Sequence, residues 1–157
     1  MQLPMEKISK YVTYQEVTKS NQATALKLAN IPNATQLNNL RLVCTNVFDK
    51  VREHFGKPIG ISSGFRSVEL NAKIGGSKTS QHCEGKALDI DGDIYGGINN
   101  KELFLYIKEN CIFDQLIWEF GSENAPDWVH VSYNEGKNRG QVLRALKVGG
   151  KTIYNFL

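Results

Sequence analysis

The chain has 157 residues, of which 41% are hydrophobic and 22% charged, and its formal net charge is +3. These values are typical of a globular protein, and we expect residues 1–157 to form a single domain. No apolar run approaches the roughly 18–20 residues of a membrane span, so we expect no membrane insertion. The mild net charge indicates no particular partner, and we expect a monomer that binds no nucleic acid.

Cysteine usage and the opening residues bear on where the chain is made. Cys44, Cys83 and Cys111 are too few and too scattered for a disulfide framework, which indicates a reducing compartment of synthesis. Residues 1–14 lack the apolar core of a secretory signal. We therefore expect synthesis in the cytoplasm without a signal peptide. If the substrate lies outside the cytoplasm, another route must carry the protein to it.

The first half of the chain predicts helices. A short helix is expected within Gln22–Ala29, and Asn33, three residues before a glutamine, resembles the start of a capping box. The helix that follows should end at Gly56 and bury one apolar stripe. Its members are Leu37, Leu40, Val43, Cys44, Val47, Phe48 and Val51. Further helices are predicted from Val68 to Ile74 and after Asn99.

Strands are predicted mainly in the second half. Ile59–Ile61 should form a short strand, and the alternation in Leu88–Asp91 predicts another with both aspartates on one face. Four later segments predict antiparallel strands: Gln115–Phe120, Trp128–Tyr133, Gln141–Leu146 and Thr152–Phe156. Helices that precede a small antiparallel sheet in so short a chain indicate an α+β fold.

Two histidines and one aspartate form a candidate metal set. Asp89 projects opposite Leu88 and Ile90, and strand alternation likewise separates His130 from the valines beside it. His82 lies in a glycine-rich loop seven residues before Asp89. Two imidazoles and one carboxylate are a common catalytic zinc set, with the fourth position left for water. Taken alone, Asp89 or His130 could be a polar residue on the solvated face of a sheet, and His82 would be an ordinary loop residue.

Residues 80–89 carry a resemblance to a known family. They read SQHCEGKALD and match the pattern S-x-H-x-x-G-x-A-x-D of the zinc D-alanyl-D-alanine carboxypeptidase family, the LAS metallopeptidases. That family includes phage endolysins that cut peptidoglycan stem peptides, and it shares its fold with the Hedgehog signalling domain. The resemblance extends from the arginine turn at 62–67 to Asp127–Tyr133. With its small size and no recognisable signal sequence, the chain most resembles the phage-type branch.

The resemblance implies a Hedgehog-like fold and roles for five residues. His82, Asp89 and His130 match the family's zinc ligands. Asp127 matches the general base that acts on the zinc-bound water, and Arg66 matches the arginine that engages the substrate's carboxylate or the attacked carbonyl. The implied cofactor is zinc and the implied substrates are peptidoglycan stem peptides. The implied activity is that of a carboxypeptidase or endopeptidase acting on the cell wall, after release during phage lysis.

Two other functions stay open. One is a bacterial housekeeping carboxypeptidase, which the missing signal sequence disfavours. The other is a non-catalytic module of the same fold, which would keep zinc for stability and bind cell wall or a protein. Asp127 and Arg66 favour catalysis over this module, because neither is needed to hold a metal.

Three further features have two readings each. Glu119 could orient His130 through a hydrogen bond, or it could be a polar surface residue. Cys83 adjoins a proposed ligand and could compete for zinc, although neighbouring side chains in an extended segment point apart. The segment from Gly136 to Thr152 holds five cations and no acid. It could contact an anionic polymer, or it could be a solvated sheet face.

Overall fold

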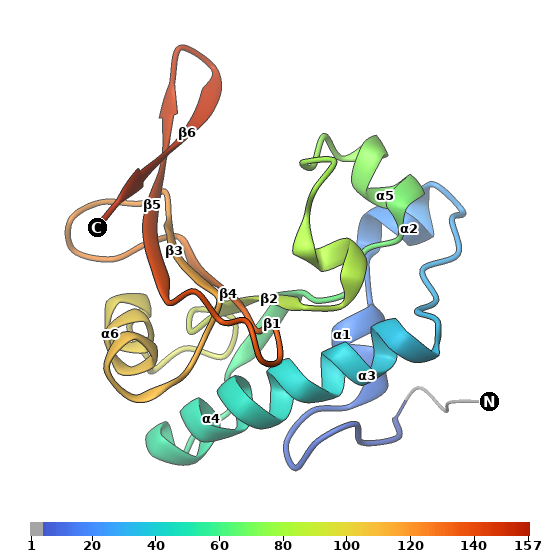
Figure 1. Ribbon diagram of the computed structural model, residues 1–157, viewed down its shortest axis with the longest axis horizontal. Coiled ribbons are helices and arrows are strands. Elements are labelled where there is room, and N and C mark those ends of the chain that lie inside the picture. Colours follow the sequence, from blue (N-terminus) through green and yellow to red (C-terminus); the bar gives the residue numbers. More distant parts are fainter. Residues whose placement is uncertain (1–4) are drawn as a thin grey trace.

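The computed structural model describes residues 5–157 and shows a six-stranded sheet flanked by helices (Figure 1). The strands are β1 (Gly60–Ser63), β2 (Ala87–Asp91), β3 (Gln115–Glu119), β4 (Trp128–Ser132), β5 (Gln141–Val148) and β6 (Lys151–Phe156). They lie in the order β1-β2-β4-β3-β5-β6. Each strand expected from the sequence is present within a few residues of its predicted bounds, and the α+β class is confirmed.

One strand pairing differs from the prediction of a purely antiparallel sheet. Strands β3 and β5 run parallel, whereas the other neighbouring pairs are antiparallel. The reason lies in the connection 133–140. It reverses the chain direction after β4, as a hairpin would, but β4 is already flanked by β2 and β3. Strand β5 therefore joins the free edge of β3, and because β3 is antiparallel to β4, β5 is parallel to β3.

The predicted long helix begins at Asn33, whose capping box with Gln36 is formed. It comprises α3 (Ala34–Val43), a π-helical turn η1 (Cys44–Phe48) and α4 (Asp49–Phe55). In its apolar stripe Leu37 is partly buried, and the other members are no more than 1% exposed. The periodicity of the sequence therefore located the face of this helix that packs on the sheet.

The remaining helices are short or lie beside the sheet. They are α1 (Tyr14–Thr18), α2 (Asn21–Ala25), α5 (Val68–Lys73), the 3₁₀ helix η2 (Gln81–Glu84) and α6 (Asn100–Asn110). Helix α1 was not expected, because five residues are too few for a periodic pattern. Within residues 5–157, none of the helices has the length and apolar character needed to cross a membrane.

The two faces of the sheet have different surroundings. On one face Leu88, Val129 and Trp118 belong to the main core, which also contains the apolar stripe of α3–α4 and residues of α6. The opposite face carries Asp89 and His130, which are paired across β2 and β4. The β5–β6 hairpin projects from this region on one side, and the segment containing α5 stands on the other (Figure 1).

Candidate metal centre

The imidazole of His82 is positioned by helix η2 and by the loop after β1. Ser80 caps η2 and accepts a hydrogen bond from the backbone N–H of His82. The ring Nδ1–H donates to the carbonyl oxygen of Gly64 at 2.7 Å, and the residue is only 2% exposed. The Nε2 atom makes no hydrogen bond within residues 5–157 and points toward the Asp89 carboxylate, whose Oδ1 lies 3.3 Å away. A histidine held through Nδ1, with Nε2 directed toward a carboxylate and another imidazole, suits a metal ligand.

Gly85 allows η2 to pack closely against helix α3. Its φ is +74°, and a Cβ atom there would lie 2.3 Å from the carbonyl oxygen of Gln36. The close approach lets Gln36 and Asn39 donate side-chain hydrogen bonds to the carbonyls of Cys83 and Glu84. The glycine of the sequence pattern is therefore required for the turn that carries His82.

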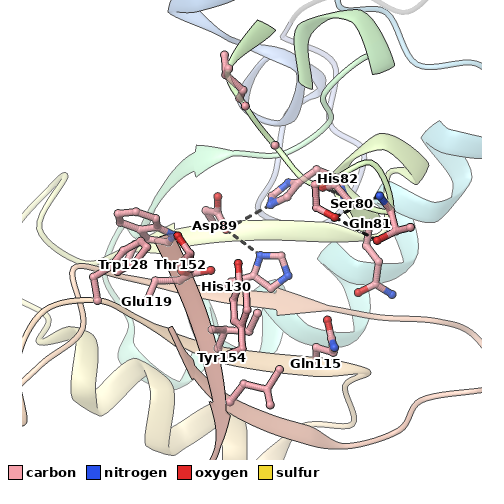
Figure 2. A pocket seen from close by; sticks show the side chains of 18 of the residues that line it. Ser80, Gln81, His82, Asp89, Gln115, Glu119, Trp128, His130, Thr152 and Tyr154 are labelled. Atoms are coloured by element: carbon pink, nitrogen blue, oxygen red, sulfur yellow. Dashed lines mark hydrogen bonds and ion pairs between the residues drawn. The ribbon is translucent and has the colours of Figure 1, made fainter. Parts of the chain in front are cut away.

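Asp89 joins the two histidines. Its Oδ1 atom lies 3.3 Å from Nε2 of His82 and 3.0 Å from Nδ1 of His130, the two contacts marked by dashed lines in Figure 2. Burial raises the pKa of Asp89, but the two imidazoles outweigh burial and hold that pKa well below its usual range. The carboxylate therefore remains ionised near neutral pH, as a metal ligand must.

The three side chains fit a divalent metal ion. One candidate ligand atom from each lies within 4.8 Å of the others, and in the described part of the chain no other His, Cys, Asp or Glu group converges in this way. Cys83 is adjacent to His82 but is not part of the group. The chemistry of the set, two imidazole nitrogens and a carboxylate oxygen, is that of zinc sites with a position left open.

The set lies on the floor of a cleft of about 930 Å³. Residues 74–77 and 79–80, between α5 and η2, line one wall together with the first residue of η2, and the β5–β6 hairpin forms the other wall with Lys147, Lys151, Thr152 and Tyr154. The volume is within the range of sites that bind small molecules and peptides. The sequence placed Lys147 and Lys151 in a basic segment that could contact an anionic polymer, but it placed none of these hairpin residues at the metal site, because their place in the cleft depends on the parallel β3–β5 pairing.

Arg66 also lines this cleft. Its backbone N–H donates to the carbonyl of His82 at 3.2 Å, which links the arginine turn to the metal set. The buried Nε atom has no hydrogen-bond partner among residues 5–157. Arg66 thus lies beside the metal set at the cleft, and its role toward substrate stays a prediction.

Asp127 is placed differently from the other predicted site residues. It is exposed and is not among the residues that line the cleft. Its backbone joins Glu119 and Asn100 through hydrogen bonds at the start of β4. The offset of three residues from His130 is odd, and side chains at odd offsets in an extended chain point to opposite sides. The assignment of Asp127 as general base stays a prediction.

Glu119 lies inside the cleft instead. It is 8% exposed and lies on the same face of the sheet as His130. Within residues 5–157 it makes no hydrogen bond to His130, the contact that one reading proposed, and the Nδ1 atom of that ring donates to Asp89 instead. Burial raises the pKa of Glu119 to about 7, and Asp89 adds to this while His130 and Arg66 oppose it. Strand alternation placed Glu119 beside Gln115 and Ile117, but only the β3–β4 pairing shows its proximity to the metal set.

The fold and the site together define a class of protein. A His-Asp-His set at the floor of a cleft, with an arginine and a second carboxylate beside it, is the arrangement of a mononuclear metal-dependent hydrolase.

Sequence comparison then identifies the family. Residues 10–132 match the family described as Peptidase M15, and the chain therefore belongs to that family of zinc-dependent metallopeptidases. A search of curated proteins found no similar sequence. The family match ends with β4, so the β5–β6 hairpin that forms one wall of the cleft lies outside it.

Proposed function

We propose that this metallopeptidase hydrolyses peptide bonds in peptidoglycan stem peptides, as a carboxypeptidase or an endopeptidase. The observation that carries the proposal is the convergence of His82, Asp89 and His130 at the floor of the cleft. The family match supports peptide hydrolysis. The resemblance of residues 80–89 to the D-alanyl-D-alanine carboxypeptidase pattern supports the substrate class.

The charges around the cleft favour an acidic peptide. Arg66, Lys147 and Lys151 line it, and peptidoglycan stem peptides carry carboxylates on side chains and at the C-terminus. Lys147 is positioned by a hydrogen bond from Nζ to Oγ1 of Thr152 at 3.0 Å and lies 5.6 Å from the centroid of the Phe120 ring. Its ammonium group therefore stands beside the cleft, where it can bind a substrate carboxylate.

The residues of the chain have distinct tasks in this hydrolysis. His82, Asp89 and His130 would hold a zinc ion, which when bound would lower the pKa of a water to near 7 and polarise the scissile carbonyl. Gly64 fixes the tautomer of His82, so the unprotonated Nε2 faces the site. Arg66 offers forked donors to a terminal carboxylate or to the negative charge that develops on the carbonyl oxygen.

We also propose that the protein serves in cell-wall lysis of the phage type. This part of the proposal rests on the resemblance to phage endolysins rather than on the geometry of the site. A housekeeping carboxypeptidase would have the same metal set, and the two roles differ in when the enzyme meets the cell wall.

Digestion of purified peptidoglycan tests the proposal. The protein is incubated with the polymer, with and without a chelator, and the soluble products are analysed by mass spectrometry. We expect new fragments that each contain one added water, their loss with chelator, and their return when zinc is restored. His130→Ala serves as a control that should release none. Zinc-loaded, folded protein that binds peptidoglycan but releases no fragments would contradict catalysis and support the binding-module alternative.

A further inference from the structure

Glu119 has a defined position relative to the metal set. On the cleft face of the sheet, Ile117 pairs with His130 and Glu119 pairs with Trp128. Glu119 is therefore the diagonal neighbour of His130, at a separation that a glutamate side chain can span. Figure 2 shows it on the same side of the metal set as Trp128 and Thr152.

The surroundings of this carboxylate are unusual. Glu119 is buried, yet within residues 5–157 its side chain makes no hydrogen bond or ion pair. Buried carboxylates are normally paired, because leaving one without a partner costs free energy. The same side chain lines the cleft, so its free oxygens face the volume that a substrate and water would occupy. Glu119 is therefore placed where its carboxylate can exchange a proton with a molecule bound in the cleft.

We propose that Glu119, rather than Asp127, carries the proton during peptide hydrolysis. This inference rests on the proposed peptidase function and assigns the general base within the same site. As the oxygen of the attacking water bonds to the scissile carbonyl carbon, one water proton moves to the Glu119 carboxylate. When the C–N bond breaks, that proton moves to the amine nitrogen. Glu119 is then a carboxylate again, and the products are a carboxyl group and an amine.

Two further observations agree with this task. Burial beside an open cleft favours uptake of a proton by this carboxyl group, because low-dielectric surroundings raise the pKa of a carboxyl group. Arg66, whose Nε is unpaired, lines the same cleft and offers a donor to the carbonyl oxygen while the proton moves. Asp127, by contrast, is exposed and lies outside the cleft lining.

The test compares Glu119→Gln with Asp127→Asn in zinc-loaded protein. Both changes keep the side-chain size and remove the carboxylate, and Glu135→Gln on the exposed surface is the charge-matched control. Turnover is measured on a mixture of defined stem peptides and generic peptides, and zinc affinity by competition with a chelator. We expect Glu119→Gln to lower kcat by roughly 10²–10⁴-fold. Its KM and zinc affinity should remain near those of the wild type, and the loss should exceed that of Asp127→Asn by at least about tenfold.

Each alternative gives a different result. Near-normal turnover in Glu119→Gln, with a large loss in Asp127→Asn, would overturn the proposal and make Asp127 the base. A loss of zinc affinity together with turnover would also overturn it, because Glu119 would then be positioning the metal ligands. Wild-type protein that cleaves only the generic peptides would contradict the proposed substrate. The ratio of kcat between Glu119→Gln and Asp127→Asn on those peptides would still decide the role of Glu119.

Discussion

Replacing Glu119 with glutamine should change how the stability of the zinc-free protein depends on pH. Burial raises the pKa of Glu119 from 4.5 to about 7 in the folded protein. A group whose pKa is raised by folding contributes stability below its unfolded pKa and loses that contribution as pH rises through its folded pKa. The two pKa values differ by about 2.5, and each pH unit corresponds to about 1.36 kcal/mol. The protonated form of Glu119 therefore contributes about 3 kcal/mol to the free energy of unfolding at low pH. This contribution should disappear between about pH 4.5 and pH 7.

Urea denaturation at pH 5 and pH 8, in the presence of a chelator, measures the effect. Because glutamine does not ionise, the free energy of unfolding of Glu119→Gln should rise relative to wild type by about 2–3 kcal/mol between the two pH values. Glu135→Gln removes a charge from an exposed site and should follow the wild type. Since a bound cation favours the ionised carboxylate, zinc should reduce the difference.

An equal pH dependence of stability in wild type and variant would show that burial does not raise the pKa of Glu119. If the free energy of unfolding changes by the same amount in wild type and in Glu119→Gln between pH 5 and pH 8, then Glu119 ionises as freely in the folded protein as in the unfolded chain. Its burial would then have no effect on its charge, and the support that the pKa gives to a proton-transfer role would be lost.

Three other substitutions test separate parts of the site. Arg66→Lys should lower kcat/KM on a defined stem peptide by roughly 10²-fold with zinc content unchanged, because one ammonium group cannot reproduce the forked donors of a guanidinium. Unaltered kinetics would exclude a role of Arg66 in binding substrate. Lys151→Glu should raise KM for acidic stem peptides several-fold with little effect on kcat, whereas equal KM values would separate the hairpin from substrate binding. Gly85→Ala should destabilise the protein by more than about 1 kcal/mol and weaken zinc retention, because it combines a φ of +74° with a 2.3 Å approach to Gln36. A melting temperature and zinc content equal to wild type would show that η2 tolerates the side chain.

Local patterns in the sequence predicted a large part of this fold. The alternation in β2 separated Asp89 from Leu88 and Ile90, and the structure buries those two residues in the core. The apolar periodicity beginning after Asn33 located the buried stripe of α3–α4. These predictions succeed because strand and helix periodicities act within a few residues of the chain.

The remaining features depend on contacts between distant segments. The parallel pairing of β3 and β5 follows from which edge of the sheet is free, and no pattern within residues 133–148 contains that information. The position of Glu119 beside His130 requires the β3–β4 register. The contribution of the β5–β6 hairpin to the cleft requires both the parallel β3–β5 pairing and the β3–β4 register. The basic C-terminal segment is likewise divided by the fold. Arg139 pairs with the buried Asp114 and Arg144 with Glu123, whereas Lys147 and Lys151 line the cleft.

The zinc content of the folded protein shows whether His82, Asp89 and His130 form a metal site. The wild-type chain should bind about one zinc ion, held by His82, Asp89 and His130. The double variant His82→Ala/His130→Ala, shown by circular dichroism to remain folded, should bind almost none. A folded double variant that retains stoichiometric zinc would contradict the account, because the metal would then be bound elsewhere and the cleft would not be a metallopeptidase site.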